Sequence, residues 1–325
     1  MITLPTTLPQ VKACEGSLRA GGTDLSELRH RGIATGPVVD LRDLPGLDAV
    51  TATPDGGLQL GALARLARIA ADPAIAAGWA GLSEAAGGLA TPQIRARATL
   101  GGSLAQQVRC WYYRSPEFQC LKKGGATCFA RSGDAVYHAA VDLGPCIAPH
   151  PSTMAAAVWA YDGRIQVDGA EFRDVPTALG DGKDPRSTHA FGPGELVTAV
   201  VLPAPVVGEQ GAYWRAIHRA RAEWPLVECV VRVRLDDAGA IAALVVVLGG
   251  IANRPLRFDE ACHACVGVAP DDPRLDDIFG AMVIPSASLP QTAYKARLVP
   301  TTIRETLDRA LAGPKVAAAA AGGVR

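Results

Sequence analysis

Along the first 90 positions, segments with the residue pattern of short strands alternate with segments that have helical periodicity. Residues 17–20 can form a short strand that runs into a glycine pair. A buried strand is predicted at 37–41, between Gly36 and Pro45, and a short apolar stretch follows at 58–60. Leucine and alanine recur at helical spacing in three further stretches, at 25–30, 63–71 and 81–89. The order of strand, glycine turn, helix and strand predicts an α/β unit.

The pattern changes twice in the rest of the chain. From 108 to 149 there is little periodicity, and the aromatic residues, glycines and cysteines there predict an insertion held by something other than a hydrophobic core. Regular structure resumes with a predicted helix over 152–159 and a predicted strand over 164–167. Further on, 230–235 and the apolar run 241–248 flank an Asp-Asp-Ala-Gly turn, which predicts a β-hairpin.

Two predicted helices close the pattern, at 258–266 and 302–311. The second opens with Thr302 and Glu305 at the spacing of a capping box, in which each side chain reaches the backbone N–H of the other residue. The tail from 314 to 325 contains five consecutive alanines and two glycines, so we expect it to be frayed.

The composition fits a globular protein with more than one core. A chain of 325 residues is too long to fold around one hydrophobic core of ordinary size, so we expect two or three sub-domains. Hydrophobic residues make up 49% of the chain and charged residues 20%, which is typical of a globular protein. The 32 basic residues balance the 32 acidic ones, which argues against broad attraction to nucleic acid or to an anionic membrane. Apolar stretches are too short for membrane insertion and no export signal is visible, so we expect a cytoplasmic protein.

Two glycine pairs are flanked by hydroxyl side chains. The first is Ala-Gly-Gly-Thr-Asp at 20–24, and the second is Thr-Leu-Gly-Gly-Ser at 99–103. A glycine pair lets the backbone approach an anion, and its N–H groups can then cradle a diphosphate. Each pair alone is more often only a turn. Together they fit a dinucleotide clamped from two sides, although neither matches the nicotinamide or the Walker A fingerprint.

These loops resemble those of a known family. The segments AGGTDL at 20–25 and IRARATLGGSL at 94–104 are similar to the FAD-binding subunits of the xanthine dehydrogenase and carbon monoxide dehydrogenase family. The resemblance continues through 145–163 and 213–257, so it covers nearly the whole chain in order. It implies a mixed α/β, or α+β, fold: a two-lobed FAD-binding domain of the PCMH type and a C-terminal α+β domain like that of the CO dehydrogenase flavoprotein.

The resemblance also implies a division of the chain. We expect the first FAD-binding lobe at 1–55 and the second at 56–205, with the cysteine-rich insertion at 108–149 inside the second lobe. The C-terminal flavoprotein domain is expected at 206–313, followed by a flexible tail at 314–325.

In such proteins the two lobes hold FAD and the third domain closes over the flavin end. The resemblance places the diphosphate and the adjoining ribityl chain against nine consecutive residues: Ser17, Leu18, Arg19, Ala20, Gly21, Gly22, Thr23, Asp24 and Leu25. It assigns the second clamp to Thr99, Gly101 and Gly102. Three more expected contacts depart from the usual family residue but keep hydrogen-bonding ability: Ser103 for Asn, Thr153 for Asp and Arg215 for Lys.

Four of the eight cysteines fall within 37 residues: Cys110, Cys120, Cys128 and Cys146. Loop thiolates can converge on an iron cage, but the spacing is not the compact ferredoxin pattern. By itself the spacing leaves open four unrelated thiols or a structural zinc site. The family branches with 4-hydroxybenzoyl-CoA reductase and periplasmic aldehyde oxidoreductase resemble this chain in their insertion, whose four cysteines bind a [4Fe–4S] cluster. The resemblance therefore implies such a cluster here.

The sequence shows no nucleophile–base pair, zinc-protease motif or paired acid/base carboxylates, so we expect no catalytic residue in this chain. The resemblance implies an electron-transfer subunit of a heterotrimeric molybdenum-dependent oxidoreductase that acts on aldehydes or N-heteroaromatic rings. Its expected partners are a small [2Fe–2S] subunit and a large molybdenum-cofactor subunit, one of which could export the complex to the periplasm. Two alternatives stay open: a zinc-stabilised interaction protein, and a self-sufficient flavoprotein oxidase.

Overall fold

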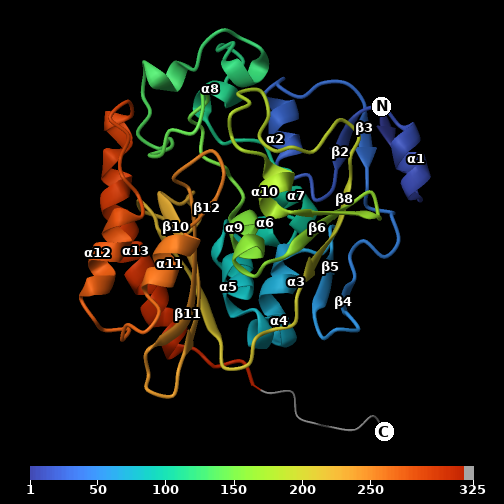
Figure 1. Ribbon diagram of the computed structural model, residues 1–325. Helices are drawn as coiled ribbons and strands as arrows, with labels where there is room; N and C mark the ends of the chain where they lie inside the picture. The colour runs from blue at the N-terminus through green and yellow to red at the C-terminus, as the bar shows by residue number, and fades with distance from the viewer. Residues whose placement is uncertain (318–325) are drawn as a thin grey trace, which may run out of the picture.

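The computed structural model describes residues 1–317 and contains three separate β-sheets (Figure 1). The first has the strand order β1-β3-β2, the second β4-β5-β8-β6-β7, and the third β12-β11-β10-β9. The first two sheets lie on one side of the molecule and the third on the other, with a layer of helices between the second and the third (Figure 1).

The first sheet is small and parallel. Its strands are β1 (Ile2–Thr3), β2 (Ser17–Arg19) and β3 (Val38–Asp40), with β3 in the middle. All three residues of β3 are buried, as expected for the central strand of a parallel sheet. The helices that belong to this lobe are α1 (Leu8–Ala13) and α2 (Leu25–His30).

The second sheet is antiparallel and joins distant parts of the chain. Its strands are β4 (Val50–Ala52), β5 (Leu58–Gly61), β6 (Arg164–Val167), β7 (Glu171–Asp174) and β8 (Val197–Leu202). β8 pairs with β5 on one edge and β6 on the other, so residues almost 140 positions apart become neighbours. Helices complete this lobe: α3 (Leu66–Ala71), α4 (Pro73–Gly78), α5 (Ala80–Gly88), α6 (Pro92–Arg95), α7 (Leu100–Leu104), α9 (Thr153–Ala160) and α10 (Val175–Leu179).

The third sheet is covered by helices on both faces. Its strands are β9 (Gln210–Ala216), β10 (Val227–Leu235), β11 (Ile241–Gly249) and β12 (Leu256–Arg257). On the outer side lie α11 (Asp259–Ala264), α12 (Arg274–Ala281) and α13 (Ala293–Ala312), preceded by the short turn η3 (Pro290–Thr292) (Figure 1). The inner side contacts α5 and α9. Burial on both faces explains why β11 is apolar throughout, while β10 also carries Glu228, Arg232 and Arg234.

The last helix differs from its prediction. α13 begins at Ala293, nine residues earlier than expected, and continues through Pro300. The hydroxyl of Thr302 donates to the carbonyl of Leu298 at 2.7 Å, so Thr302 lies inside the helix and caps nothing. The expected capping box is therefore wrong, because packing of the helix on β9 and β10 extends it past the local start signal.

The cysteine-rich insertion lies at the top of the molecule in Figure 1, next to α2 and above the third sheet. It contains only short helices: α8 (Trp111–Arg114), η1 (Leu121–Lys123) and η2 (Phe129–Arg131). Arg114 anchors it to the first lobe through Asp24 and Glu27, at 2.6 and 3.0 Å. Ionic and polar contacts thus hold much of the insertion in place.

The end of the described chain is attached to the body. Val316 donates its N–H to Glu209 at 2.8 Å and accepts from the N–H of Gly208 at 2.9 Å. The remainder of the expected tail, residues 318–325, lies outside the described residues. Within residues 1–317 none of the helices has the length and apolar character needed to cross a bilayer.

Candidate functional site

The two glycine loops lie directly against each other. A Cβ at Gly21 would collide with the backbone carbonyl of Arg97, which precedes the second loop. A Cβ at Gly102 would lie 3.8 Å from the Cβ of Ala20 in the first loop. Glycine at position 21 is thus required for the two backbones to approach. The expectation that both loops border one site is supported by this contact.

The first loop presents unused backbone donors. It connects β2 to α2, and Gly22 adopts a left-handed conformation with φ of 75°. In the described part of the chain, none of the hydrogen bonds has an amide of residues 20–25 as its donor. Such a run of free N–H groups in a glycine turn is the backbone arrangement that binds phosphate.

The carboxylate of Asp24 leaves these amides free. Asp24 occupies the N-cap position of α2, yet its side chain makes no capping hydrogen bond. It accepts instead from the N–H of Gln107 at 2.8 Å and from the Arg114 guanidinium at 2.6 Å. Asp24 therefore connects the first loop to the insertion and does not compete with an anion for the loop.

The second loop uses its own amides internally. The N–H groups of Leu100 and Gly101 donate to Ala64 and Ala62, at 3.0 and 2.8 Å. The N–H of Gly102 donates to the Thr99 hydroxyl at 3.2 Å. The expectation of a second amide cradle is therefore wrong, because the carbonyls of the segment that follows β5 and the Thr99 hydroxyl already accept from these amides. What the second loop provides is a stretch of glycine backbone, at Gly101 and Gly102, that a ligand can approach closely.

A cavity of about 480 Å³, which we call the loop cleft, opens along the first loop. All nine residues from Ser17 to Leu25 line it, together with Thr99, Gly101 and Gly102. Phe191 and Leu196, which precede β8, and Val197, its first residue, also line the cleft. The cleft therefore lies between the first lobe and the second.

A second cavity of about 250 Å³, the ring pocket, continues from the loop cleft. The two cavities share four lining residues: Thr23, Asp24, Gly102 and Gln106. Ser103, Thr153 and Arg215, the three other residues expected at the cofactor, line the ring pocket. The structure thus brings every residue of the predicted FAD site to one continuous cleft.

Several of these polar side chains bind protein groups. The Thr153 hydroxyl donates to the buried Glu228 carboxylate at 2.7 Å, and the Tyr213 hydroxyl donates to the same carboxylate at 2.9 Å. Burial raises the pKa of Glu228. Arg215 donates to the carbonyl oxygens of Arg221 and Glu223 in the turn between β9 and β10. Thr153 and Arg215 therefore shape the wall of the ring pocket through their neighbours.

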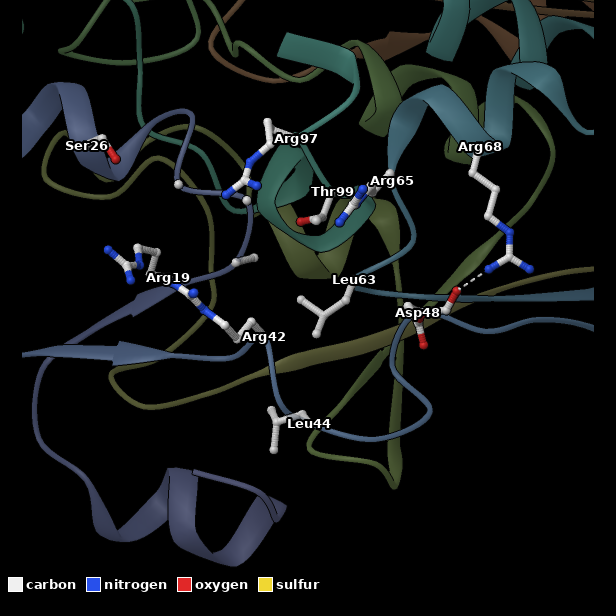
Figure 2. Close-up of a pocket in the computed structure, with 13 residues that line it drawn as sticks. Arg19, Ser26, Arg42, Leu44, Asp48, Leu63, Arg65, Arg68, Arg97 and Thr99 are labelled. Carbon is white, nitrogen blue, oxygen red and sulfur yellow. Dashed lines mark hydrogen bonds between the residues drawn. The ribbon is translucent and has the colours of Figure 1, made fainter. Parts of the chain in front are cut away.

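Arginines gather beside the first loop around a third cavity of about 660 Å³, which we call the arginine cavity (Figure 2). It shares Arg19, Ala20, Gly21, Gly22, Leu63 and Thr99 with the loop cleft. Its other arginines are Arg42, Arg65, Arg68 and Arg97. Sequence reasoning missed this cluster, although Arg19 and Arg97 stand directly before the two loops.

The arginines differ in how they are held. Arg19 and Arg42 both donate to Asp40, the buried last residue of β3. Burial opposes ionisation of Asp40, but the hydrogen bonds from Arg42 and Arg19 outweigh it and hold its pKa at about 2. Arg65 and Arg97, which flank Thr99 in Figure 2, have no acceptor among the described residues. Their charge is available to a ligand.

The four clustered cysteines border one small cavity in the insertion. Cys120 and Cys146 are buried, and Cys110 and Cys128 are half-buried. All are free thiols. Burial raises the pKa of Cys110 to about 11, whereas a hydrogen bond from the Cys146 thiol lowers that of Cys128 to about 6. Across residues 1–317, no three His, Cys, Asp or Glu side chains are placed so that they could hold a metal ion. The cluster stays a prediction.

The other paired cysteines lie in the core of the C-terminal domain. Cys262 and Cys265 are buried beside Val246 and Phe279, within one apolar cluster. Burial raises the pKa of both thiols. These surroundings are those of core thiols that pack against apolar side chains.

Comparisons with known proteins match both halves of the chain to families of flavoprotein domains. Residues 10–205 match the family described as the FAD binding domain in molybdopterin dehydrogenase, and residues 212–310 match the CO dehydrogenase flavoprotein C-terminal domain. The aldehyde oxidoreductase FAD-binding subunit PaoB of Escherichia coli K12 is 36% identical over 250 residues, covering 74% of this chain and 76% of PaoB. Subunit alpha of the 6-hydroxypseudooxynicotine dehydrogenase complex of Paenarthrobacter nicotinovorans is 38% identical over 306 residues, covering 91% and 87%.

Solved structures show the same architecture. Reconstituted CO dehydrogenase from Oligotropha carboxidovorans contains a chain that superposes with a TM-score of 0.73. The superposition covers 96% of this chain and 97% of that one, at 20% identity. The fold class expected from the sequence is thereby confirmed.

Proposed function

This chain belongs to the family of FAD-binding subunits of the molybdenum hydroxylases, and from that membership we propose that it holds FAD along the loop cleft and the ring pocket. FAD supplies the redox chemistry, since a flavin accepts electrons singly and delivers them singly or in pairs. The chain supplies binding, orientation and protection from water.

The observation that carries this proposal is the run of unused amides at residues 20–25 on the wall of the loop cleft. Six unpaired backbone donors in one turn are costly unless an anion or water accepts from them. A diphosphate placed there has two neighbours of positive charge, Arg65 and Arg97, across the shared loop. Gly21, Gly101 and Gly102 keep the approach free of side chains.

The ring pocket suits the flavin ring. It continues from the diphosphate loop, and Trp224, Pro225 and Pro151 give it flat apolar walls. Ser103 adds a hydroxyl group to the wall, and its Oγ lies 3.3 Å from Ser152 Oγ behind it. Polar side chains such as Gln106 and Arg109 line the pocket as well. The turn between β9 and β10, fastened by Arg215, covers the pocket from the third domain. Closure by this turn excludes water from the ring.

We also propose that Cys110, Cys120, Cys128 and Cys146 hold a [4Fe–4S] cluster. Convergence of four thiols from four separate loops on one cavity supports this. Lys122 also lines this cavity, and its ammonium group donates to the carbonyl of Ser187 at 2.5 Å. Burial lowers the pKa of Lys122.

We propose that the chain works in a heterotrimer. Relatives named as FAD-binding or alpha subunits are parts of an aldehyde oxidoreductase and of a 6-hydroxypseudooxynicotine dehydrogenase complex. By this proposal a large partner oxidises an aldehyde or an N-heteroaromatic ring at its molybdenum cofactor, and a small [2Fe–2S] partner delivers the electrons here. This chain then passes them to an external acceptor and needs no acid or base of its own.

The test is an absorbance spectrum with quantitation of flavin, iron, zinc and molybdenum on the purified complex. We expect one FAD per chain and iron in excess of the four atoms that two [2Fe–2S] clusters account for. Zinc without iron or flavin in this chain would support a zinc-stabilised interaction protein instead. Substrate turnover by the isolated chain would support a self-sufficient oxidase and contradict the proposal.

A further inference from the structure

A fourth cavity, which we call the aromatic cavity, lies between the ring pocket and the cysteines. Its volume is about 330 Å³. It shares Arg109, Pro151, Glu223, Trp224 and Pro225 with the ring pocket. It also shares Cys110 with the cavity that the four cysteines border. A molecule bound in it would be next to both proposed redox sites.

Aromatic side chains form much of its wall. The ring of Trp111 meets the edges of Tyr137 and His138, with centroids 5.9 and 5.0 Å apart. Trp224 stands at the mouth, 47% exposed, with the Arg109 guanidinium 4.7 Å from its ring centroid. Such flat, polarizable walls favour a planar aromatic ligand.

Polar atoms of the lining residues lack partners. Among the described residues, six buried side-chain nitrogen or oxygen atoms make no hydrogen bond, and three of them belong to residues that line this cavity. These three are Arg109 Nε, His138 Nδ1 and His150 Nε2. The Nδ1 of His150 accepts the N–H of Ser152 at 3.3 Å, so its Nε2 carries the proton and is a donor. Unpaired buried donors indicate a missing acceptor.

The charges around the cavity exclude an anion. Among the described residues that line it, Arg109 is the one Lys or Arg, and it is already paired with Asp24 and Glu27 at 3.1 and 2.9 Å. Glu223 and Glu228 add carboxyl groups to the wall. A nicotinamide dinucleotide carries two phosphates and would meet no free cation here. The cavity therefore suits an uncharged ring that accepts hydrogen bonds.

We propose that the aromatic cavity binds the external electron acceptor, and that this acceptor is an uncharged quinone. The inference rests on the proposed function, which supplies the reduced flavin. The quinone takes up two electrons and two protons and leaves as the hydroquinone, while FADH₂ returns to FAD. A quinone carbonyl group accepts a hydrogen bond from the free Nε2–H of His150, and the quinone ring packs against Trp111 and Tyr137.

The test measures binding of 2-methyl-1,4-naphthoquinone to the oxidised, FAD-loaded complex by isothermal titration calorimetry. Tyr137→Ala and His218→Ala remove cavity side chains that lie on the surface and outside the ring pocket and the proposed cluster ligands. Phe172→Ala and His263→Ala are matched controls, because both residues are exposed and line none of the cavities described above. Flavin and iron content are measured for every protein, which tests the proposed function separately.

We expect the wild-type complex to bind one quinone per chain. The double variant Tyr137→Ala/His218→Ala should bind it about tenfold more weakly or worse, with flavin content and aldehyde KM unchanged. The control variants should bind like the wild type. Equal affinity in the cavity variants, or tighter binding of NAD⁺ than of the quinone, would overturn the proposal even if FAD is present.

Discussion

Gly21 packs against the backbone carbonyl of Arg97 so closely that no Cβ fits between them. This contact joins the diphosphate loop of the first lobe to the segment that leads into the second glycine loop. It fixes the position of the free amides relative to Thr99 and Gly102. The two lobes therefore meet through backbone, and the geometry of the proposed FAD site depends on one residue without a side chain.

The Gly21→Ala variant should lose FAD. Overpacking at a tight contact costs about 1–3 kcal/mol, so we expect FAD affinity to fall roughly 10- to 100-fold. Calorimetric titration of the flavin-free chain with FAD measures the change. Gly280→Ala is the control, since the Cβ at that position in α12 meets no atom within 4 Å and alanine favours a helix. Unchanged FAD affinity in Gly21→Ala would contradict the proposed loop geometry.

Removing Arg114 should loosen the cysteine insertion. Its guanidinium is buried and donates to Asp24, Glu27 and two backbone carbonyls. Arg114→Met removes these four contacts and leaves Arg109 as the remaining buried cation beside the two carboxylates. Breaking a buried pair costs on the order of 3 kcal/mol in the free energy of unfolding, measured by urea denaturation. Arg274→Met removes an exposed pair with Asp272 and should cost less than about 1 kcal/mol. Similar losses in the two variants would show that Arg114 is not the anchor.

The Cys128→Ala variant should lose the iron of this chain and keep FAD. Cys128 borders the cysteine cavity, while none of the flavin-site cavities includes it. Iron quantitation, flavin quantitation and electron paramagnetic resonance of the reduced complex provide the readouts. Cys14→Ala is the matched control, because Cys14 is half-buried and packs near Val11 in the first lobe. Full iron content in Cys128→Ala would rule out its role as a ligand.

Asp40 should make the first lobe sensitive to acid. Its pKa is about 2 in the folded protein against an ordinary 3.8, so its contribution to stability is complete above pH 4 and disappears as pH falls to 2. Solvent in the adjoining arginine cavity screens the attraction between Asp40 and its two arginines. We therefore expect the charge of Asp40 to contribute on the order of 1–2 kcal/mol to the free energy of unfolding. The difference in unfolding free energy between wild type and Asp40→Asn should shrink between pH 5 and pH 2. A constant difference would mean that the charge of Asp40 is not responsible.

The free guanidinium groups should make FAD binding dependent on salt. Arg97→Gln should weaken binding several-fold at low ionic strength and less at high ionic strength, because exposed charges are screened within about 10 Å at 0.1 M salt. Titrations at two salt concentrations measure this effect. Arg29→Gln lies on α2 away from the arginine cavity and should leave FAD affinity unchanged. Equal weakening at both salt concentrations would indicate a structural effect of the substitution.

Sequence reasoning found features that depend on neighbouring residues. The segment from Ser17 to Leu25 carries strand, glycine turn and helix signals in order, and the structure forms β2, the loop and α2 there. The hairpin of β10 and β11 followed from an apolar run and a turn in the same way. The helix start predicted at Thr302 was wrong, because the packing of α13 on the third sheet outweighs the local capping signal.

Features made by distant residues could not be predicted in this way. The amides of Leu100 and Gly101 donate to the carbonyls of Ala64 and Ala62. The sequence of the second loop alone does not indicate these acceptors. The arginine cavity combines residues from β2, α3 and the segment before α7, while the aromatic cavity joins the insertion to the third domain. Only the folded chain brings these side chains together.

A structure of the FAD-loaded complex tests the central claim most directly. The account predicts diphosphate oxygens at hydrogen-bond distance, about 2.7–3.2 Å, from amide nitrogens of residues 20–25, with the flavin ring in the ring pocket beside Ser103 and Trp224. A diphosphate bound elsewhere, with those amides facing only water, would contradict it.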